Sequence, residues 1–135
     1  MIEHNERPPW GGFTVLDSSS SIYRAVLYQR WIKNGVQPGA FIRRDRDRNG
    51  ISINDPNSCS PRQLCALFRE CFGVLRLSVS EIRNLHLDIK PDLHPHHNAC
   101  DHGNIVGLPL TSADPFHAEF LAGELAKRAT FEWQP

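Results

Sequence analysis

The sequence predicts a single α+β domain with two main helices and several short strands in a mixed or antiparallel sheet. Helical and strand patterns intermix along the chain, with few of the long crossovers that a parallel sheet requires. The chain has 135 residues, of which 40% are hydrophobic and 22% charged, an ordinary balance for one globular domain. Prolines and glycines crowd residues 8–12, so we expect residues 1–12 to be a flexible arm and residues 13–135 to form the domain.

Short strands are predicted where apolar, β-branched and aromatic residues alternate or run together. They are expected at residues 22–27, 51–53, 74–79, 87–89, 104–107 and 129–133. The tight-turn signal Asn49-Gly50 directly precedes the second of these strands. A short helix is expected at residues 28–34, ending at Gly35, and a helical turn at residues 80–85.

Two longer helices complete the predicted elements. The first is expected at residues 60–72, with Ser60 as its N-cap and Gln63 completing a capping box. Its predicted apolar face consists of Leu64, Leu67, Phe68, Cys71 and Phe72. The second begins at Asp114-Pro115, and the side chains expected to point inward are Phe116, Phe120, Leu121 and Leu125.

Composition excludes several classes of protein. Lys and Arg together number fifteen, as do Asp and Glu, so we expect neither a membrane nor nucleic acid as partner. No apolar run approaches the roughly 20 residues of a membrane helix. The first residues lack the apolar segment of a signal peptide, which predicts a cytoplasmic protein. Its four cysteines, none in a C-x-x-C pair, are therefore expected to be thiols.

A histidine-rich segment is the most distinctive candidate site. Four of the seven histidines, His94, His96, His97 and His102, lie within nine residues, with Cys100 between them. Zinc prefers imidazole and thiolate, so His97, Cys100 and His102 are candidate ligands, although adjacent histidines point apart on an extended chain. A structural zinc site, which we do not favour, a catalytic or substrate-binding histidine, and a solvated loop all stay open. His102 is the preferred catalytic candidate because it directly precedes a predicted strand.

Arg24 interrupts an otherwise apolar predicted strand, where an unpaired guanidinium is costly to bury. Either strand alternation turns Arg24 to solvent, or its guanidinium binds a phosphate or carboxylate. Residues 45–50 match the opening of a calcium-binding EF-hand loop, but Pro56 stands where that loop needs a glutamate. We therefore expect a tight turn there instead of a calcium site.

Four segments between residues 22 and 109 form an ordered set of motifs: Ile22-Tyr23-Arg24, residues 32–38, Gly50-Ile51-Ser52-Ile53 and residues 74–79. Their order resembles that of ADP-ribosyltransferase-like domains, including small bacterial toxins that consume NAD. The resemblance implies that Arg24 holds the phosphates or ribose of NAD and that Ser52 lines its nicotinamide side. The acidic residue that the family carries on a late strand has no matching motif here. His102 or Asn104 are candidates for that role, and Glu132 is a weaker one.

Cleavage of the nicotinamide–ribose bond passes through an oxocarbenium-like state, which needs pinned phosphates, a stacked ring and stabilisation of positive charge. Arg24 is expected to meet the first need and Tyr23 or Trp31 the second. We therefore expect Arg24, Ser52 and His102 to converge in one cavity as catalytic residues.

Two alternatives to this enzyme stay open. One is a zinc-stabilised, non-catalytic interaction module. The other is a metal-free RNA-cleaving toxin in which His102 is the general base. The expected partners across these hypotheses are a nucleotide ligand and an antitoxin or target protein.

Overall fold

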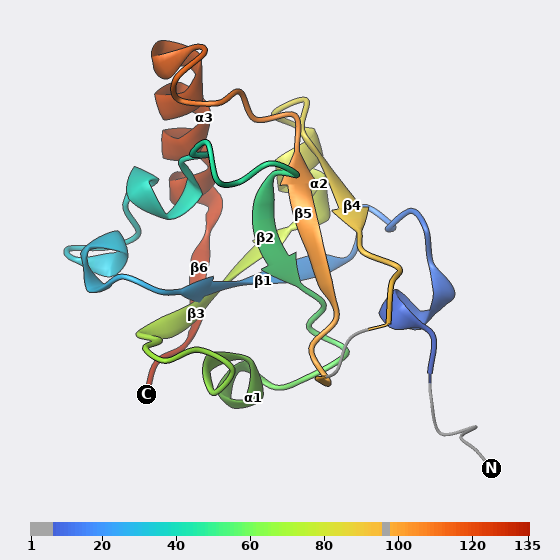
Figure 1. Ribbon diagram of the computed structural model, residues 1–135. Helices are drawn as coiled ribbons and strands as arrows, with labels where there is room; N and C mark the ends of the chain where they lie inside the picture. Colours follow the sequence, from blue (N-terminus) through green and yellow to red (C-terminus); the bar gives the residue numbers. More distant parts are fainter. Residues whose placement is uncertain (1–6, 96–97) are drawn as a thin grey trace.

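The computed structural model describes residues 7–95 and 98–135, which fold around one six-stranded antiparallel sheet (Figure 1). The strand order is β4-β5-β2-β1-β3-β6. The strands are β1 (Ser21–Val26), β2 (Ile51–Asn54), β3 (Gly73–Ser78), β4 (Asp88–Pro91), β5 (His102–Val106) and β6 (Thr130–Trp133). The helices are α1 (Pro61–Cys65), α2 (Val79–Arg83) and α3 (Pro115–Arg128), and 3-10 turns occupy Pro9–Gly12, Gln29–Ile32 and Pro38–Phe41. The predicted α+β class is confirmed.

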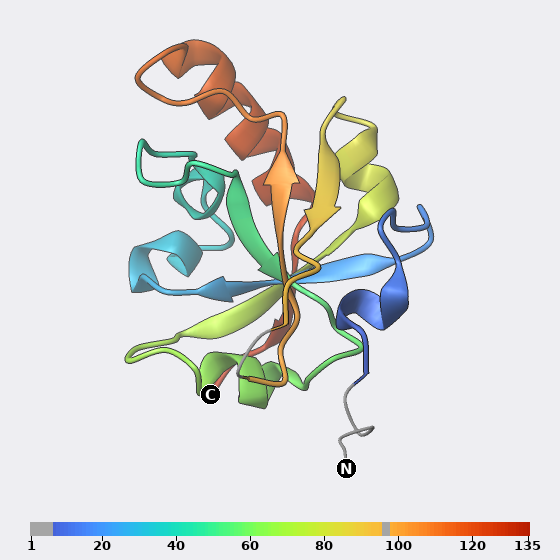
Figure 2. The ribbon, with the colours of Figure 1, turned by 45° about the vertical axis from the view of Figure 1, so that its right-hand side comes forward.

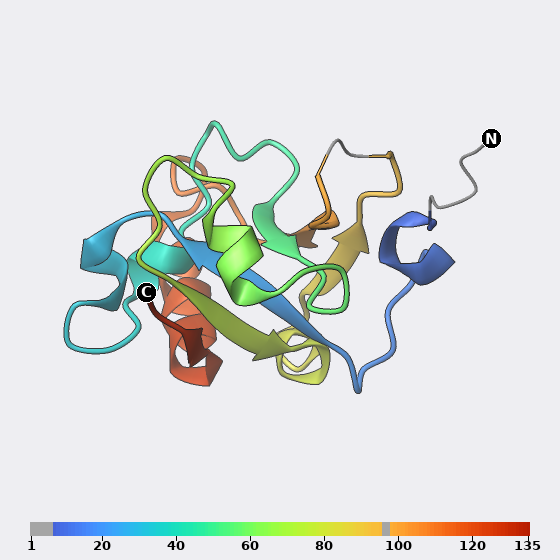
Figure 3. The same ribbon diagram turned by 90° about the horizontal axis from the view of Figure 1, so that it is seen from below.

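The sheet carries an apolar cluster on each face, because side chains alternate between the faces along every strand. The larger cluster buries Ile22, Ile53 and Ile105 with residues of α3 and of the turn Pro38–Phe41. The smaller cluster, around Tyr23, lies on the other face, next to α1. Accordingly, α1 and α3 lie on opposite sides of β1 and β3 (Figure 2). Seen from below, α1 is in front of β1 and α3 is behind it (Figure 3).

The helix predicted at residues 60–72 begins as expected but ends early. Ser60 and Gln63 form the predicted capping box, each side chain accepting a hydrogen bond from the other's backbone N–H. The α-helix stops at Cys65 because Cys65 forms a disulfide with Cys71, with 5.3 Å between their Cα atoms. Six residues of helix would separate these atoms by roughly 9 Å, which no disulfide spans. The chain must turn back, and the predicted helix was too long.

The helix predicted from Asp114 is confirmed as α3, but its inward face was partly wrong. Asp114 caps it by accepting a hydrogen bond from the His117 N–H at 3.1 Å. Phe116 and Phe120 point to solvent, with 87% and 63% of their surface exposed. The buried stripe is Ala118, Leu121, Ala122, Leu125 and Ala126. This stripe has helical spacing, but three of its five members are alanines, which carry little weight in a hydrophobic pattern.

Residues 7–12 are not the loose arm that the prolines and glycines predicted. Trp10 is 3% exposed and belongs to the larger apolar cluster. Its indole N–H donates to the carbonyl of His102 at 2.8 Å. Residues 1–6, the rest of the expected arm, lie outside the described residues.

The expectation of free thiols was wrong. Cys59 pairs with Cys100, 41 positions away, and Cys65 pairs with Cys71. The sequence held no signal for these pairs, since the fold alone brings Cys59 and Cys100 within 5.2 Å at their Cα atoms. Within residues 7–95 and 98–135, no helix has both the length and the apolar character needed to cross a bilayer.

Candidate functional site

Arg24 is held in a fixed position by backbone carbonyls. It lies on the sheet face of Ile22 and Val26, where its Nε donates to the Ala40 carbonyl and its Nη1 to the Ser52 carbonyl, both at 3.0 Å. Its guanidinium carbon lies 4.9 Å from the centre of the Trp31 ring. Burial lowers the pKa of Arg24 to about 10, so the group still carries its charge at neutral pH. The structure therefore presents a half-buried cation that is held by main-chain carbonyls and is not turned fully to solvent.

A pocket of about 220 Å³ opens beside this guanidinium. Its walls include three arginines, two aromatic rings and one carboxylate, from Arg24, Arg44, Arg46, Tyr28, Trp31 and Asp47. We call it the arginine pocket. Among the described residues, none of the three arginines lies within ion-pair distance of a carboxylate. The buried indole N–H of Trp31 also lacks a described hydrogen-bond acceptor. Donors thus outnumber acceptors around this pocket.

A second pocket, of about 510 Å³, lies over β4 and β5. Its polar walls come from Asn49, Lys90, Asp92, His94, His102 and Asn104, and we call it the histidine pocket. Lys90 and Asn104 are cross-strand partners. The ladder continues past the end of β4, where the Asp92 N–H donates to the His102 carbonyl at 2.9 Å. The side chains of Asp92 and His102 meet there, with 3.5 Å between Oδ2 and Nδ1.

The predicted site residues divide between the two faces of the sheet. Ser52 pairs with Asn104 across the strands β2 and β5, and Asn54 pairs with both His102 and Tyr23. Directly opposed residues share a face, so Tyr23, Ser52, His102 and Asn104 lie on one face. Arg24 follows Tyr23 in the strand and therefore lies on the other face, beside Trp31.

The structure thus brings Arg24 together with Trp31, and His102 together with Asn104, but these pairs line separate pockets. Ser52 approaches Arg24 only through its backbone carbonyl. The weaker candidate Glu132 lies on β6, where its carboxylate accepts a hydrogen bond from Arg76 at 2.7 Å. The expected convergence of guanidinium, hydroxyl and imidazole is therefore not observed. Strand alternation explains this, because neighbouring residues point to opposite faces.

Cys100 is not available as a thiolate ligand for the zinc site that the sequence left open. Cys100 is bonded to Cys59, and His97 lies outside the described residues. Over residues 7–95 and 98–135, no group of three or more His, Cys, Asp or Glu side chains is arranged to hold a metal ion.

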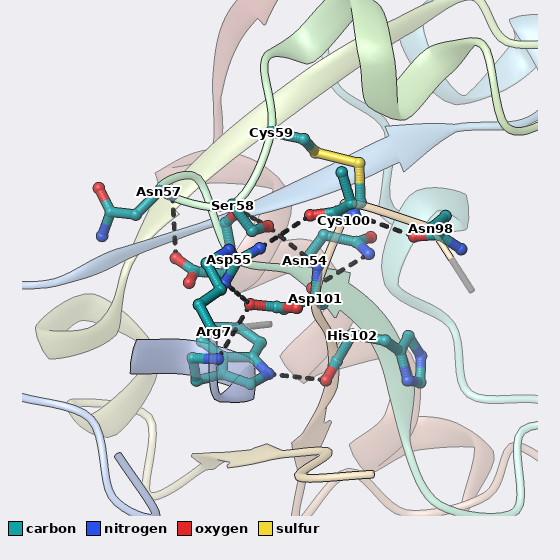
Figure 4. Close-up of polar contacts among 12 residues, drawn as sticks. Arg7, Asn54, Asp55, Asn57, Ser58, Cys59, Asn98, Cys100, Asp101 and His102 are labelled. Atoms are coloured by element: carbon teal, nitrogen blue, oxygen red, sulfur yellow. Dashed lines mark hydrogen bonds and ion pairs between the residues drawn. A yellow bond between two sulfur atoms is a disulfide. The ribbon is translucent and has the colours of Figure 1, made fainter. Parts of the chain in front are cut away.

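A buried carboxylate fixes the base of the histidine-rich segment (Figure 4). Asp101 is 6% exposed, and its Oδ2 accepts hydrogen bonds from Arg7 Nη1 at 2.6 Å and from the Trp10 N–H at 2.9 Å. Its backbone N–H donates to Ser58 Oγ at 2.9 Å, beside the Cys59–Cys100 disulfide. The imidazole of the next residue, His102, points away from this network (Figure 4). The network therefore holds the backbone of His102, and none of its other side chains lines the histidine pocket.

The sequence patterns did not indicate the charged residues that complete both pockets. Arg46 and Asp47 belong to the 45–50 segment, which was interpreted only as a turn, and Arg44 directly precedes it. A hydrogen bond from the Gly50 N–H to the Asp47 carbonyl at 3.3 Å confirms the turn. The mixed basic and acidic run was the signal that could have indicated a polar pocket. Lys90 and Asp92 gave no comparable pattern. No protein-family model, curated protein or solved structure matches the chain.

Proposed function

We propose that the arginine pocket binds a nucleotide and that the protein is an NAD-consuming enzyme of the ADP-ribosyltransferase-like type. The observation that carries this proposal is the half-buried guanidinium of Arg24, fixed by two carbonyls against the Trp31 ring. Hydrogen bonds from the remaining N–H groups of Arg24 to an anion would stabilise this partly buried positive charge. Phosphate suits the planar fork of arginine particularly well.

The composition of the arginine pocket favours a phosphate joined to an aromatic base. Arg44 and Arg46 add positive charge at the exposed side of the pocket. The half-buried ring of Tyr28, whose centroid lies 5.1 Å from that of the buried Trp31 ring, offers an apolar surface for a base. At about 220 Å³ the pocket is smaller than the ~300–1,000 Å³ of sites that enclose a drug-sized ligand, so it encloses only part of a dinucleotide.

Asp47 supplies the carboxylate that the family resemblance lacked. It lines the arginine pocket, and its Oδ2 accepts a hydrogen bond from the Arg44 N–H at 2.9 Å. When the nicotinamide–ribose bond breaks, the bonding electrons leave with nicotinamide and positive charge develops on the ribose. A fixed carboxylate stabilises that charge until water or a target nucleophile attacks. In this proposal Asp47 takes the role for which His102, Asn104 and Glu132 were candidates.

The binding test uses calorimetric titration of the protein with NAD and with ADP-ribose. Replacing Arg24 with Ala should weaken binding at least tenfold, and the exposed pair Arg44→Ala/Arg46→Ala should do so without disturbing the fold. Arg62→Ala, on the far side of the sheet in α1, removes one positive charge, as Arg24→Ala does, and should bind like the parent. If neither ligand binds, or if the double variant binds normally, the proposal is overturned.

The activity test measures nicotinamide released from NAD. Asp47→Asn should lower release at least a hundredfold while binding changes by less than threefold, because the carboxylate acts on the transition state. Binding of NAD without any release would overturn the enzymatic half of the proposal and leave a nucleotide-binding domain.

The predicted cytoplasmic location is replaced in this proposal by an oxidising compartment. Two disulfides persist where thiols are kept oxidised, which is characteristic of exported proteins. The toxin hypothesis further predicts a target protein that accepts ADP-ribose and an antitoxin in the producing cell.

A further inference from the structure

The histidine pocket gathers two imidazoles, a carboxylate and a lysine on the sheet face opposite Arg24. The β4–β5 register places Lys90 beside Asn104 and, two residues further, Asp92 beside His102. The chain then turns, because the His94 N–H donates to Asp92 Oδ1 at 3.1 Å. That turn returns His94 to the wall of the same pocket.

Asp92 contacts His94 and His102 with different carboxylate oxygens. Its Oδ1 holds the backbone of His94, while its Oδ2 lies 3.5 Å from Nδ1 of His102. When Nδ1 of an imidazole faces a carboxylate, the carboxylate orients the ring and Nε2 is the atom that transfers protons. Asp92 is therefore a positioning residue, and His102 is a candidate general base.

We propose that the histidine pocket cleaves single-stranded RNA by metal-free general acid–base catalysis. His102 removes the proton from a ribose 2′-hydroxyl, and the 2′-oxygen attacks the adjacent phosphorus. The bond from phosphorus to the 5′-oxygen breaks, and protonated His94 donates a proton to the leaving oxygen. The products are a 2′,3′-cyclic phosphate and a free 5′-hydroxyl, and proton exchange with water restores both histidines.

The other polar groups of the pocket suit the charge that develops in this step. The Lys90 ammonium stabilises the negative phosphoryl oxygens of the transition state. The side-chain amides of Asn49 and Asn104 supply donors and acceptors for the edge of an unstacked base. The zero net charge of the chain disfavours a broad nucleic-acid surface, but a pocket for one phosphodiester needs only a local cation.

The test incubates the purified protein with a labelled single-stranded oligoribonucleotide in excess EDTA and identifies the products by mass. We expect a 2′,3′-cyclic phosphate from RNA and no cleavage of the same sequence as DNA, which lacks the attacking hydroxyl. His102→Ala and His94→Gln should each lower the rate about a hundredfold or more. His117→Gln changes an exposed histidine at the start of α3 and should leave the rate unchanged.

Asp92→Asn tests the positioning role separately. It should lower kcat at least tenfold with KM changed by less than twofold, because the carboxylate orients His102 and does not bind substrate. His94 is exposed, so His94→Gln keeps the test decisive even if His102→Ala fails to fold. Absence of cyclic phosphate, or an unchanged rate in His94→Gln, overturns the proposal.

This inference is independent of the arginine pocket. Arg24→Ala should weaken NAD binding at least tenfold and leave the rate of RNA cleavage unchanged. His94→Gln should lower the rate of RNA cleavage about a hundredfold and leave NAD binding unchanged. A failure of one proposal is thus distinguishable from a failure of the other.

Discussion

Asp101 connects segments that are far apart in the sequence. Arg7, 94 positions away, and the backbone of Trp10 both donate to its carboxylate. Its own carbonyl accepts hydrogen bonds from Asp55 N–H and, at 3.3 Å, from the Asn54 amide. A single acidic residue therefore holds the N-terminal segment, the end of β2 and the start of β5 together.

Replacing Asp101 with Ala should destabilise the fold by about 3 kcal/mol, because the buried N–H of Trp10 loses its acceptor. The change is measured as the free energy of unfolding in urea. Asp88 is a matched control, since its ion pair with Arg83 is at the surface and its side chain is 55% exposed. Asp88→Ala should cost less than about 1 kcal/mol. Equal losses in the two variants would contradict the structural role of Asp101.

The shifted pKa of the Asp55 carboxyl makes the stability of the fold depend on pH. Burial raises the pKa of this carboxyl above its usual value of 3.8, and nearby Asp101 raises it further, against hydrogen bonding from the Asn57 N–H and the charge of Arg7. A carboxyl whose pKa is higher in the folded than in the unfolded state stabilises the fold at low pH, and this stability is lost as the pH rises.

Asp55→Asn keeps an acceptor for the Asn57 N–H and removes the buried charge. Its melting temperature should exceed that of the parent at pH 7, and the difference should vanish below about pH 4. Melting curves recorded between pH 3 and pH 7 measure this trend. A variant that melts lower than the parent at pH 7 would show that the charge of Asp55 is stabilising.

At the scale of elements, a close backbone contact fixes the start of β2 against β5. Gly50 has a φ of +120°, and a Cβ atom on it would lie 2.1 Å from the carbonyl oxygen of Ile105. Only glycine fits this approach of two backbones. The contact matters for both pockets, because the 47–50 turn carries Asp47 into one and Asn49 into the other.

Gly50→Ala should lower stability by at least about 2 kcal/mol, since it combines a strained φ with a backbone clash. Gly123 is the opposite case, because it lies inside α3 and a Cβ atom on it would meet nothing within 4 Å outside its own helix. Gly123→Ala should raise stability by about 0.5–1 kcal/mol through helix propensity. Thermal melting of both variants checks the pair, and the same sign of change in each would contradict this explanation.

At the scale of the whole molecule, the disulfides close loops of very different length. The Cys59–Cys100 bond spans 41 positions and the Cys65–Cys71 bond only 6. Because loop-closure entropy grows with loop length, the longer loop should contribute about 4 kcal/mol and the shorter one about 2 kcal/mol.

The double variants Cys59→Ser/Cys100→Ser and Cys65→Ser/Cys71→Ser separate these contributions. The first should lower the urea midpoint more than the second, and thiol titration of the unfolded, unreduced parent should detect no free cysteine. Detection of four thiols in that experiment would contradict both bonds.

Local patterns predicted much of the secondary structure. The predicted strand at residues 51–53 became Ile51–Asn54, and the capping box at Ser60 formed as expected. These signals depend on neighbours within a few residues, which the sequence displays directly. The face of α3 and the end of α1 were mispredicted because packing of alanines and a disulfide decided them.

The candidate site was predicted only in pieces. Arg24 with Trp31, and His102 with Asn104, were identified as residues of one site, and each pair does meet. Their separation onto two faces, and the arrival of Asp47 and Asp92 beside them, depend on strand register and on loops. No local pattern encodes which strand lies next to which.

By itself the sequence determined the α+β class, most strand positions, both helix starts and the polar side chains able to do chemistry, because each depends on short-range propensity and periodicity. Tertiary structure alone decided which cysteines pair, that Trp10 belongs to the core, and that the polar residues form two pockets instead of one. These outcomes depend on contacts between residues that are tens of positions apart in the sequence. Such contacts form only when the whole sheet has assembled.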